Sequence, residues 1–171
     1  IAAGFVGWRY GRLLEGAMVQ LQEAKAQAEA AAPQIRTLLG AAIDAVIEID
    51  ETSTILMANE AAYRMFGWPD GELIGQNVTV LMPPAEREKH RAGLRRYLET
   101  GESHLIGNVV EVTGSRRDGT LVPCELSLAA MTLPDGTRRF VGIHRDITER
   151  KQAEERIRTF AQAIESAMEG I

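Results

Sequence analysis

The sequence is poor in the residues that build disulfide-linked and metal-based scaffolds. Its 171 residues include one cysteine, Cys124, and three histidines, His90, His104 and His144. One cysteine cannot form a disulfide within the chain and excludes paired-cysteine zinc motifs, so a reducing compartment is the simpler expectation. The histidines are too scattered to predict a metal cluster. The motifs GxxxxGK[ST], HExxH and GxSxG are also absent. We therefore expect no enzyme active site in this segment.

The sequence also lacks an excess of positive charge and a long apolar run. Its 19 basic and 24 acidic residues give a net charge of −5, which argues against a nucleic-acid partner. Apolar residues make up 45%, typical of a folded chain with about one domain plus extensions.

The apolar run over residues 1–8 is too short to span a bilayer, but Trp8 followed by Arg9, Tyr10 and Arg12 is typical of a membrane helix end on the cytoplasmic side. We expect a tether to the inner membrane before residue 9. A frayed amphipathic terminus is the alternative. The first residue, Ile1, and the last, Ile171, suggest a fragment of a longer protein.

Two heptad patterns flank the middle of the chain. The first predicts a coiled-coil linker over residues 9–32, with a break at Pro33 and a second helical piece over 33–42. Its a/d positions are Leu14, Ala17, Leu21, Ala24, Ala28, Ala31, Ile35, Leu38 and Ala42. The second pattern comprises Ile157, Phe160, Ile164, Met168 and Ile171. Together they predict a parallel homodimer, held weakly at the first stripe because alanine buries little apolar area.

The middle of the chain changes to short strands and helices separated by turn residues. The predicted order is strands over 45–50 and 54–59, a helix over 60–66, short helical pieces within 70–82, a helix over 84–100, strands over 105–117, 120–133 and 138–148, and a helix from 149. Asp118-Gly119 and Pro134-Asp-Gly136 predict hairpin turns between the last strands. This order predicts an α+β fold, with a five-stranded antiparallel sheet and helices on one face.

Several short motifs resemble those of PAS sensory domains. They are Asn59-Glu-Ala-Ala-x-x-x-Phe66-Gly67, Glu72-Leu-Ile-Gly75, Arg117-Asp-Gly119, Pro123 and Gly142-x-x-Arg145-Asp-Ile-Thr-Glu149. The resemblance implies a PAS domain over residues 33–148 and a signalling helix over 149–171. The end of that helix is similar to the opening of a second PAS domain. It also implies a sensory input module, most often attached to a two-component histidine kinase, that signals through flanking helices in a dimer.

A further set of residues resembles the haem-binding PAS domains of FixL-type oxygen-sensor kinases. They are His90, Arg96-Tyr97, Thr100-Gly101, Ile106-Gly107, Gly114, Arg116-Arg117-Asp-Gly119 and Pro123. The resemblance implies a haem b site with His90 as the proximal iron ligand and Arg96 and His104 facing the propionates. Leu105, Leu126 and Leu128 would form the apolar distal wall, with Tyr97 and Gly142 in the same site. A diatomic gas or the redox state would be the signal.

One position departs from that pattern. Val110 stands where the subfamily carries a distal arginine, and valine cannot donate a hydrogen bond to a bound gas. Two alternatives therefore stay open: a cofactor-free relay and dimerisation module, or a pocket for a flavin or small organic ligand. The flavin-adduct cysteine of light-sensing PAS domains would fall near residues 75–78, where there is none. The charged run around His90 is by itself typical of a solvated helix face. His144 alternates with Phe140 and Gly142, which predicts an inward, hydrogen-bonded core histidine.

Overall fold

The computed structural model describes residues 22–27 and 43–169, with side chains described as far as Ile164. The chain divides into two units, residues 1–41 and 42–171. Residues 22–27 of the first unit are helical and exposed. The predicted membrane-helix end at residues 1–8, and nearly all of the first heptad stripe, lie outside the described residues. Among the residues described, no helix is long and apolar enough to cross a bilayer.

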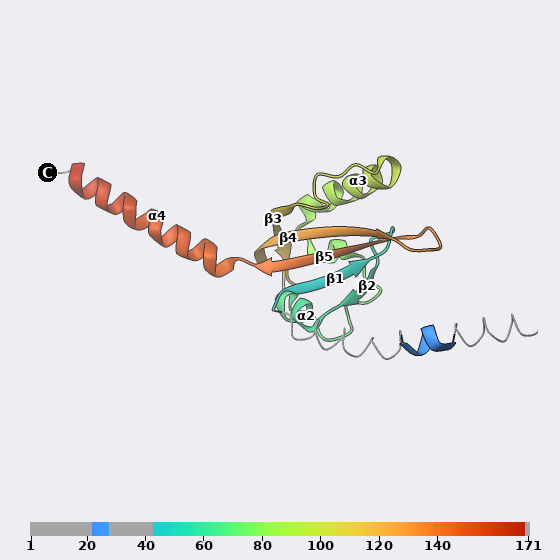
Figure 1. The fold of residues 1–171 in the computed structure, drawn as a ribbon. Coiled ribbons are helices and arrows are strands. Elements are labelled where there is room, and N and C mark those ends of the chain that lie inside the picture. The colour runs from blue at the N-terminus through green and yellow to red at the C-terminus, as the bar shows by residue number, and fades with distance from the viewer. Residues whose placement is uncertain (1–21, 28–42, 170–171) are drawn as a thin grey trace, which may run out of the picture. The chain divides into compact units, whose positions relative to one another are not determined.

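A single antiparallel sheet organises the second unit (Figure 1). Its five strands lie in the order β2-β1-β5-β4-β3, so the first and last strands in sequence, β1 and β5, are neighbours. Their bounds are β1 (Ala45–Ile49), β2 (Ile55–Ala58), β3 (Val109–Ser115), β4 (Leu121–Thr132) and β5 (Arg138–Asp146). The hairpins β3–β4 and β4–β5 turn at Gly119 and Gly136, both at positive φ. The predicted five-stranded antiparallel sheet is confirmed.

The strand predicted over residues 105–117 is too long. Its first residues form turns, because the Ser103 hydroxyl oxygen accepts the backbone N–H of Leu105 at 3.0 Å, and Gly107 adopts a left-handed φ of 80°. Ile106 nevertheless bridges to Leu128 in parallel. This segment therefore runs beside Leu128 of β4 before β3 begins at Val109.

Four helical elements accompany the sheet (Figure 1). They are α2 (Glu60–Phe66), the 3₁₀ helix η1 (Val78–Leu81), α3 (Pro84–Thr100) and α4 (Thr148–Glu169). Asn59 caps α2 and ties it to β1, because its Oδ1 accepts the N–H of Ala62 at 3.0 Å and that of Val46 at 2.9 Å. α3 ends at Gly101, whose left-handed conformation lets its N–H bond to Tyr97. The helical pieces predicted within 70–82 reduce to η1 and preceding turns.

The hydrophobic core joins one face of the sheet to the helices. Ile47, Ile49, Val122 and Phe140 of the strands pack with Phe66 of α2. Burying a phenylalanine of this kind contributes about 1.5–3 kcal/mol. Gly114 makes this packing possible, because a Cβ there would lie 2.8 Å from Phe66 Cε1. The predicted placement of the helices on one face of the sheet is confirmed, and α3 packs against the core only through partly buried side chains.

α4 follows directly from the end of β5 (Figure 1). All of its described side chains up to Ile164 are exposed or nearly so. Three apolar residues of the second heptad pattern are among them: Ile157 and Phe160, each 70% exposed, and Ile164. The side chains of Met168 and Ile171 lie outside the described part of the chain. The predicted helix is present, and its pairing in a dimer stays a prediction.

Candidate functional site

A cavity of about 340 Å³ lies between the sheet and α3. Its walls come from β1, β4 and β5, from η1 and α3, and from the turns at residues 102–106. Ile47 and Ile49 of β1, Val78 of η1 and Leu94 of α3 supply apolar surface. The volume falls at the lower end of the range for small-molecule sites, which are mostly apolar with a few polar groups. The cavity is therefore the candidate ligand site of the domain.

Eight of the nine residues predicted for cofactor binding line this cavity. They are His90, Arg96, Tyr97, His104, Leu105, Leu126, Leu128 and Gly142. These residues come from α3, the following turns, β4 and β5, so the fold brings together positions up to 52 residues apart. Val110, the ninth, is not among the lining residues. It pairs with Leu126 across β3 and β4 and so lies one strand beyond the cavity wall. The role of each residue toward a ligand stays a prediction.

His90 lies in the cavity wall and is only partly exposed. The charged run alone would indicate a fully solvated helix face, but His90 does not lie on one. Its Nε2 lies 2.9 Å from the hydroxyl oxygen of Ser53, which is buried in the β1–β2 turn. Burial lowers the pKa of His90 below its usual value, and the positive charge of Arg91 adds to this. His90 is therefore a neutral imidazole at neutral pH.

Polar side chains gather at the exposed edge of the cavity. Arg96 pairs with Glu102 at 3.1 Å, and both side chains are more than half exposed. Lys89 and His104, also exposed, line the same edge. Tyr97 instead lies against the sheet, with its ring edge-on to Phe140 at 5.6 Å. The site thus has an apolar interior and a rim that carries more cationic than anionic groups.

His144 borders the cavity from β5. Its ring meets Phe66 edge-on at 5.7 Å, and its Nδ1 is buried without a hydrogen-bond partner among the described residues. Burial lowers the pKa of His144 to about 4, opposed by a hydrogen bond with the backbone of Ala45. The neighbouring Gly142 leaves room for this ring, since a Cβ there would lie 3.0 Å from His144 Cε1. His144 points inward as predicted, yet one of its nitrogens stays unpaired.

Some polar residues at or beside the cavity were not predicted from the sequence: Lys89 and Glu102 line it, and Ser53, which does not, contacts the lining residue His90. Ser53 contacts His90 from a turn 37 positions away, and no local pattern marks such a pair. Lys89 and Glu102 sit in polar stretches that are typical of any exposed helix end. The feature that distinguishes Ser53 is its backbone φ of 66°, the only left-handed value of a non-glycine residue among those described. That value is visible only in the structure.

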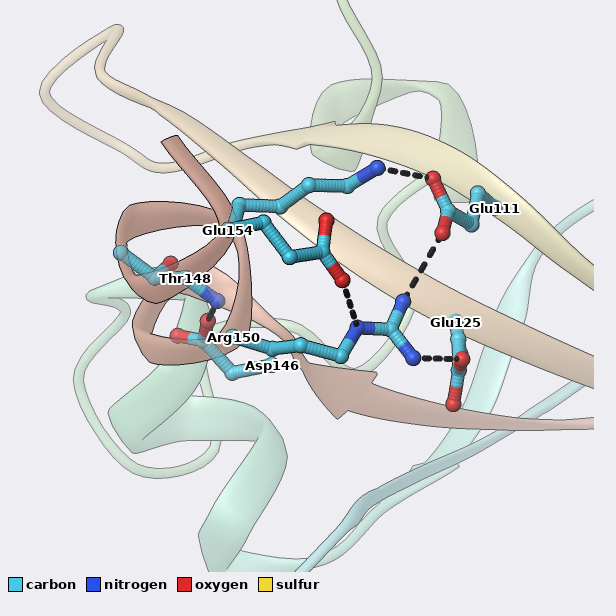
Figure 2. Close-up of polar contacts among 7 residues, drawn as sticks. Glu111, Glu125, Asp146, Thr148, Arg150 and Glu154 are labelled. Carbon is cyan, nitrogen blue, oxygen red and sulfur yellow. Dashed lines mark hydrogen bonds and ion pairs between the residues drawn. The ribbon is translucent and has the colours of Figure 1, made fainter. Parts of the chain in front are cut away.

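An ion-pair cluster joins the start of α4 to the sheet (Figure 2). The Arg150 guanidinium bonds to Glu111 of β3 at 2.8 Å and to Glu125 of β4 at 2.6 Å. Glu154 lies 3.7 Å from the same guanidinium, and Lys151 pairs with Glu111. Asp146 accepts the N–H of Thr148 at 2.8 Å and so caps the helix. We name Glu111, Glu125, Arg150 and Lys151 the α4 anchor. The resemblance predicted a signalling helix from residue 149 but did not point to the two glutamates.

Cys124 lies apart from the cavity-lining residues and is completely buried. Burial raises the pKa of its thiol to about 11. It packs as a small apolar side chain, and its position offers no nucleophile to a ligand in the cavity.

The family model for the PAS fold matches residues 34–147. Sensor protein FixL of Bradyrhizobium diazoefficiens is 40% identical over 150 residues, which are 85% of this chain and 29% of that protein. Cell-division control histidine kinase PdhS of Brucella ovis is 25% identical over 95% of this chain and 17% of its own length. The chain thus spans less than a third of either curated relative.

Solved structures agree on the fold. The PAS domain of an HTR-like protein from Haloarcula marismortui matches 74% of this chain and 99% of its own, with a TM-score of 0.58 and 23% identity. A light-oxygen-voltage domain studied with a flavin analogue matches 74% of this chain and 93% of its own, with a TM-score of 0.53 and 21% identity. The family model covers most of the chain, and solved PAS domains share its fold. The chain belongs to the PAS family.

Proposed function

We propose that this PAS domain is the sensory input module of a two-component histidine kinase and that its cavity holds haem b with His90 as the axial ligand. The observation that carries the proposal is the convergence of eight predicted residues on one apolar cavity with an imidazole in its wall. The 40% identity to a sensor protein, FixL, supports the sensory role. The name of PdhS, a histidine kinase, supports the proposed attachment.

The residues present fit such a group in three respects. A histidine must be neutral to bind a metal, and burial favours the neutral form of His90 by lowering its pKa. Leu126 and Leu128 face the cavity from β4 and can exclude water from one face of a flat apolar ring. Lys89 and Arg96 at the rim can pair with propionates. Arg96 is bound to Glu102, but an exposed pair is worth at most about 1 kcal/mol and exchanges readily.

When bound, the haem would supply a binding place for a diatomic gas and a redox-active iron. This chain's residues would determine which gases are favoured. Val110 offers no hydrogen-bond donor, and it does not line the cavity. A gas whose binding needs a hydrogen bond is therefore less stabilised here than with an arginine. The site would discriminate less against carbon monoxide and nitric oxide.

The proposed output runs through the flanking helices of a homodimer. The exposed apolar residues of α4, Ile157 and Phe160, are suited to pairing with a second copy. A tether before residue 9 would hold the domain on the cytoplasmic side of the inner membrane.

Two alternatives differ in what the cavity contains. A cofactor-free domain would relay signals and hold the dimer together. A flavin or another small organic ligand could use the same apolar cavity, and light-oxygen-voltage domains share the fold. The buried Cys124 does not line the cavity, so a flavin would be held without a cysteine adduct.

Absorption spectroscopy of the purified chain, expressed with a haem precursor, tests the proposal. We expect a Soret band that shifts on reduction and on exposure to carbon monoxide. His90→Ala should abolish it, and added imidazole should restore part of it. Glu88→Ala is the matched control, because Glu88 lies on the same helix, is exposed and does not line the cavity. A colourless protein that does not bind added haemin would refute haem binding. A flavin spectrum would favour the alternative in which the cavity holds a flavin.

A further inference from the structure

Ser53 holds an unusual backbone position in the β1–β2 turn. Its φ of 66° lies in the left-handed region, where a side chain is disfavoured and glycine is the usual residue. Ser53 is nevertheless buried, with 5% of its surface exposed. A left-handed residue that is not glycine persists where its surroundings fix it and often marks a functional contact.

The turn around Ser53 is fixed from both sides. The Asp50 carboxylate accepts the backbone N–H groups of Thr52 at 2.8 Å and Thr54 at 2.9 Å. The Ser53 N–H donates to the Asp50 carbonyl at 3.1 Å, and the Ser53 carbonyl accepts the N–H of Val78 at 2.8 Å. These bonds leave the turn little freedom to move. The Ser53 hydroxyl is therefore a stationary group presented to α3.

The side chain of Ser53 makes a contact that glycine would lose, the 2.9 Å hydrogen bond to His90 Nε2. This nitrogen is the outer one of the imidazole and the natural ligand for a metal in the cavity. It cannot bond to the serine hydroxyl and to a metal in the same orientation. Because the turn is fixed, the histidine ring has to move for ligation.

We propose that Ser53 is a positioning residue that competes with the cavity ligand for His90 and so lowers the affinity of the site. The inference rests on the proposed function, because the competitor is the haem iron. Without haem, Ser53 keeps the imidazole against the β1–β2 turn. Binding of His90 to the iron breaks its hydrogen bond to the Ser53 hydroxyl. The binding free energy for haem is therefore reduced by the net free energy of that hydrogen bond.

Titration of the chain with haemin tests this proposal on two variants. Ser53→Ala removes the hydroxyl and keeps the unfavourable backbone position. Ser53→Gly removes the hydroxyl and relieves that position. Both should raise the affinity for haemin about two- to tenfold, the range given by the net worth of one hydrogen bond. Their unfolding midpoints in urea should move apart, with Ser53→Ala below Ser53→Gly.

A merely structural serine would change haemin affinity in step with stability, and therefore in different directions in the two variants. Thr52→Ala is the matched control, because it removes a hydroxyl from the same turn at an exposed residue that does not line the cavity. Unchanged or weaker haemin affinity in both Ser53 variants, beside a wild type that binds haemin through His90, would overturn the competition alone. A wild type without haemin binding would overturn the proposed function and this inference together.

Discussion

Acidification should destabilise this domain through His144. Burial lowers the pKa of His144 to about 4 in the folded state, whereas the unfolded chain titrates near 6.5. Between these values the unfolded chain binds a proton that the folded chain does not. The free energy of unfolding therefore falls as the pH drops below about 6.5, and the loss levels off below about 4. Above 6.5 the imidazole is neutral in both states and contributes no slope.

The size of this effect follows from the difference between the two pKa values. At about 1.36 kcal/mol for each pKa unit, His144 should remove roughly 2 kcal/mol at pH 5 and about 3 kcal/mol at pH 4. Urea unfolding at pH 7, 5.5, 5 and 4.5 would measure the slope. His144→Leu should flatten it by this amount. His90, whose pKa is also lowered, contributes in the same direction and stays in the variant as an internal reference.

The variant also separates two effects at neutral pH. Leucine removes the unpaired Nδ1, whose burial costs about 1–3 kcal/mol, and it loses the edge contact with Phe66. We expect His144→Leu to be neutral or slightly stabilising at pH 7. If the pH slope of the variant equals that of the wild type, water reaches the His144 ring in the folded state and the reasoning is wrong.

Three further predictions concern stability and reactivity. Arg150→Ala should lower the midpoint of urea unfolding slightly and lose this effect in 1 M salt, whereas Arg158→Ala, which breaks only a pair within α4, should leave the midpoint nearly unchanged. Gly114→Ala should destabilise by about 1–3 kcal/mol because its Cβ would meet Phe66, while Gly93→Ala, with open space around it, should stabilise by about 0.5–1 kcal/mol. Cys124 should react with a thiol reagent at pH 8 at least about a hundredfold more slowly than an unfolded control, and equal rates would show that the thiol is not buried.

The sheet and its hairpins could be predicted because local signals specify them. Gly119 and Gly136 both adopt the left-handed conformation that their turns require, and apolar alternation marks the strands beside them. The β3 boundary failed for the opposite reason. Residues 105–108 are apolar enough for a strand, but a Ser103 side chain bond and the left-handed Gly107 bend the chain there.

Most of the predicted site residues do line the cavity, but the contacts that they make there could not be predicted. A resemblance transfers residue identities, so His90, Leu126 and Gly142 were expected in one site and they line one cavity. It does not transfer contacts that depend on other residues of this chain. Ser53 reaches His90 only because a turn 37 residues away adopts a left-handed conformation. The unpaired Nδ1 of His144 likewise follows from the close packing around Gly142 and Phe66.

β4, which borders the cavity, and its neighbour β3 also hold α4. Side chains alternate along a strand, so Leu126 faces the cavity while its neighbour Glu125 faces the opposite side. Glu111 is paired directly with Glu125 across β3 and β4, and Arg150 bonds to both carboxylates (Figure 2).

A guanidinium that bridges two adjacent strands responds to a shift of one strand against the other, which a contact to a single strand would not detect. Each contact of the α4 anchor is partly exposed, with the Arg150 side chain 42% accessible, so each is weak and can be exchanged with little loss of free energy. If a ligand moved β4 through its contact with Leu126, a small difference in affinity between the two arrangements would be enough to change how α4 is held.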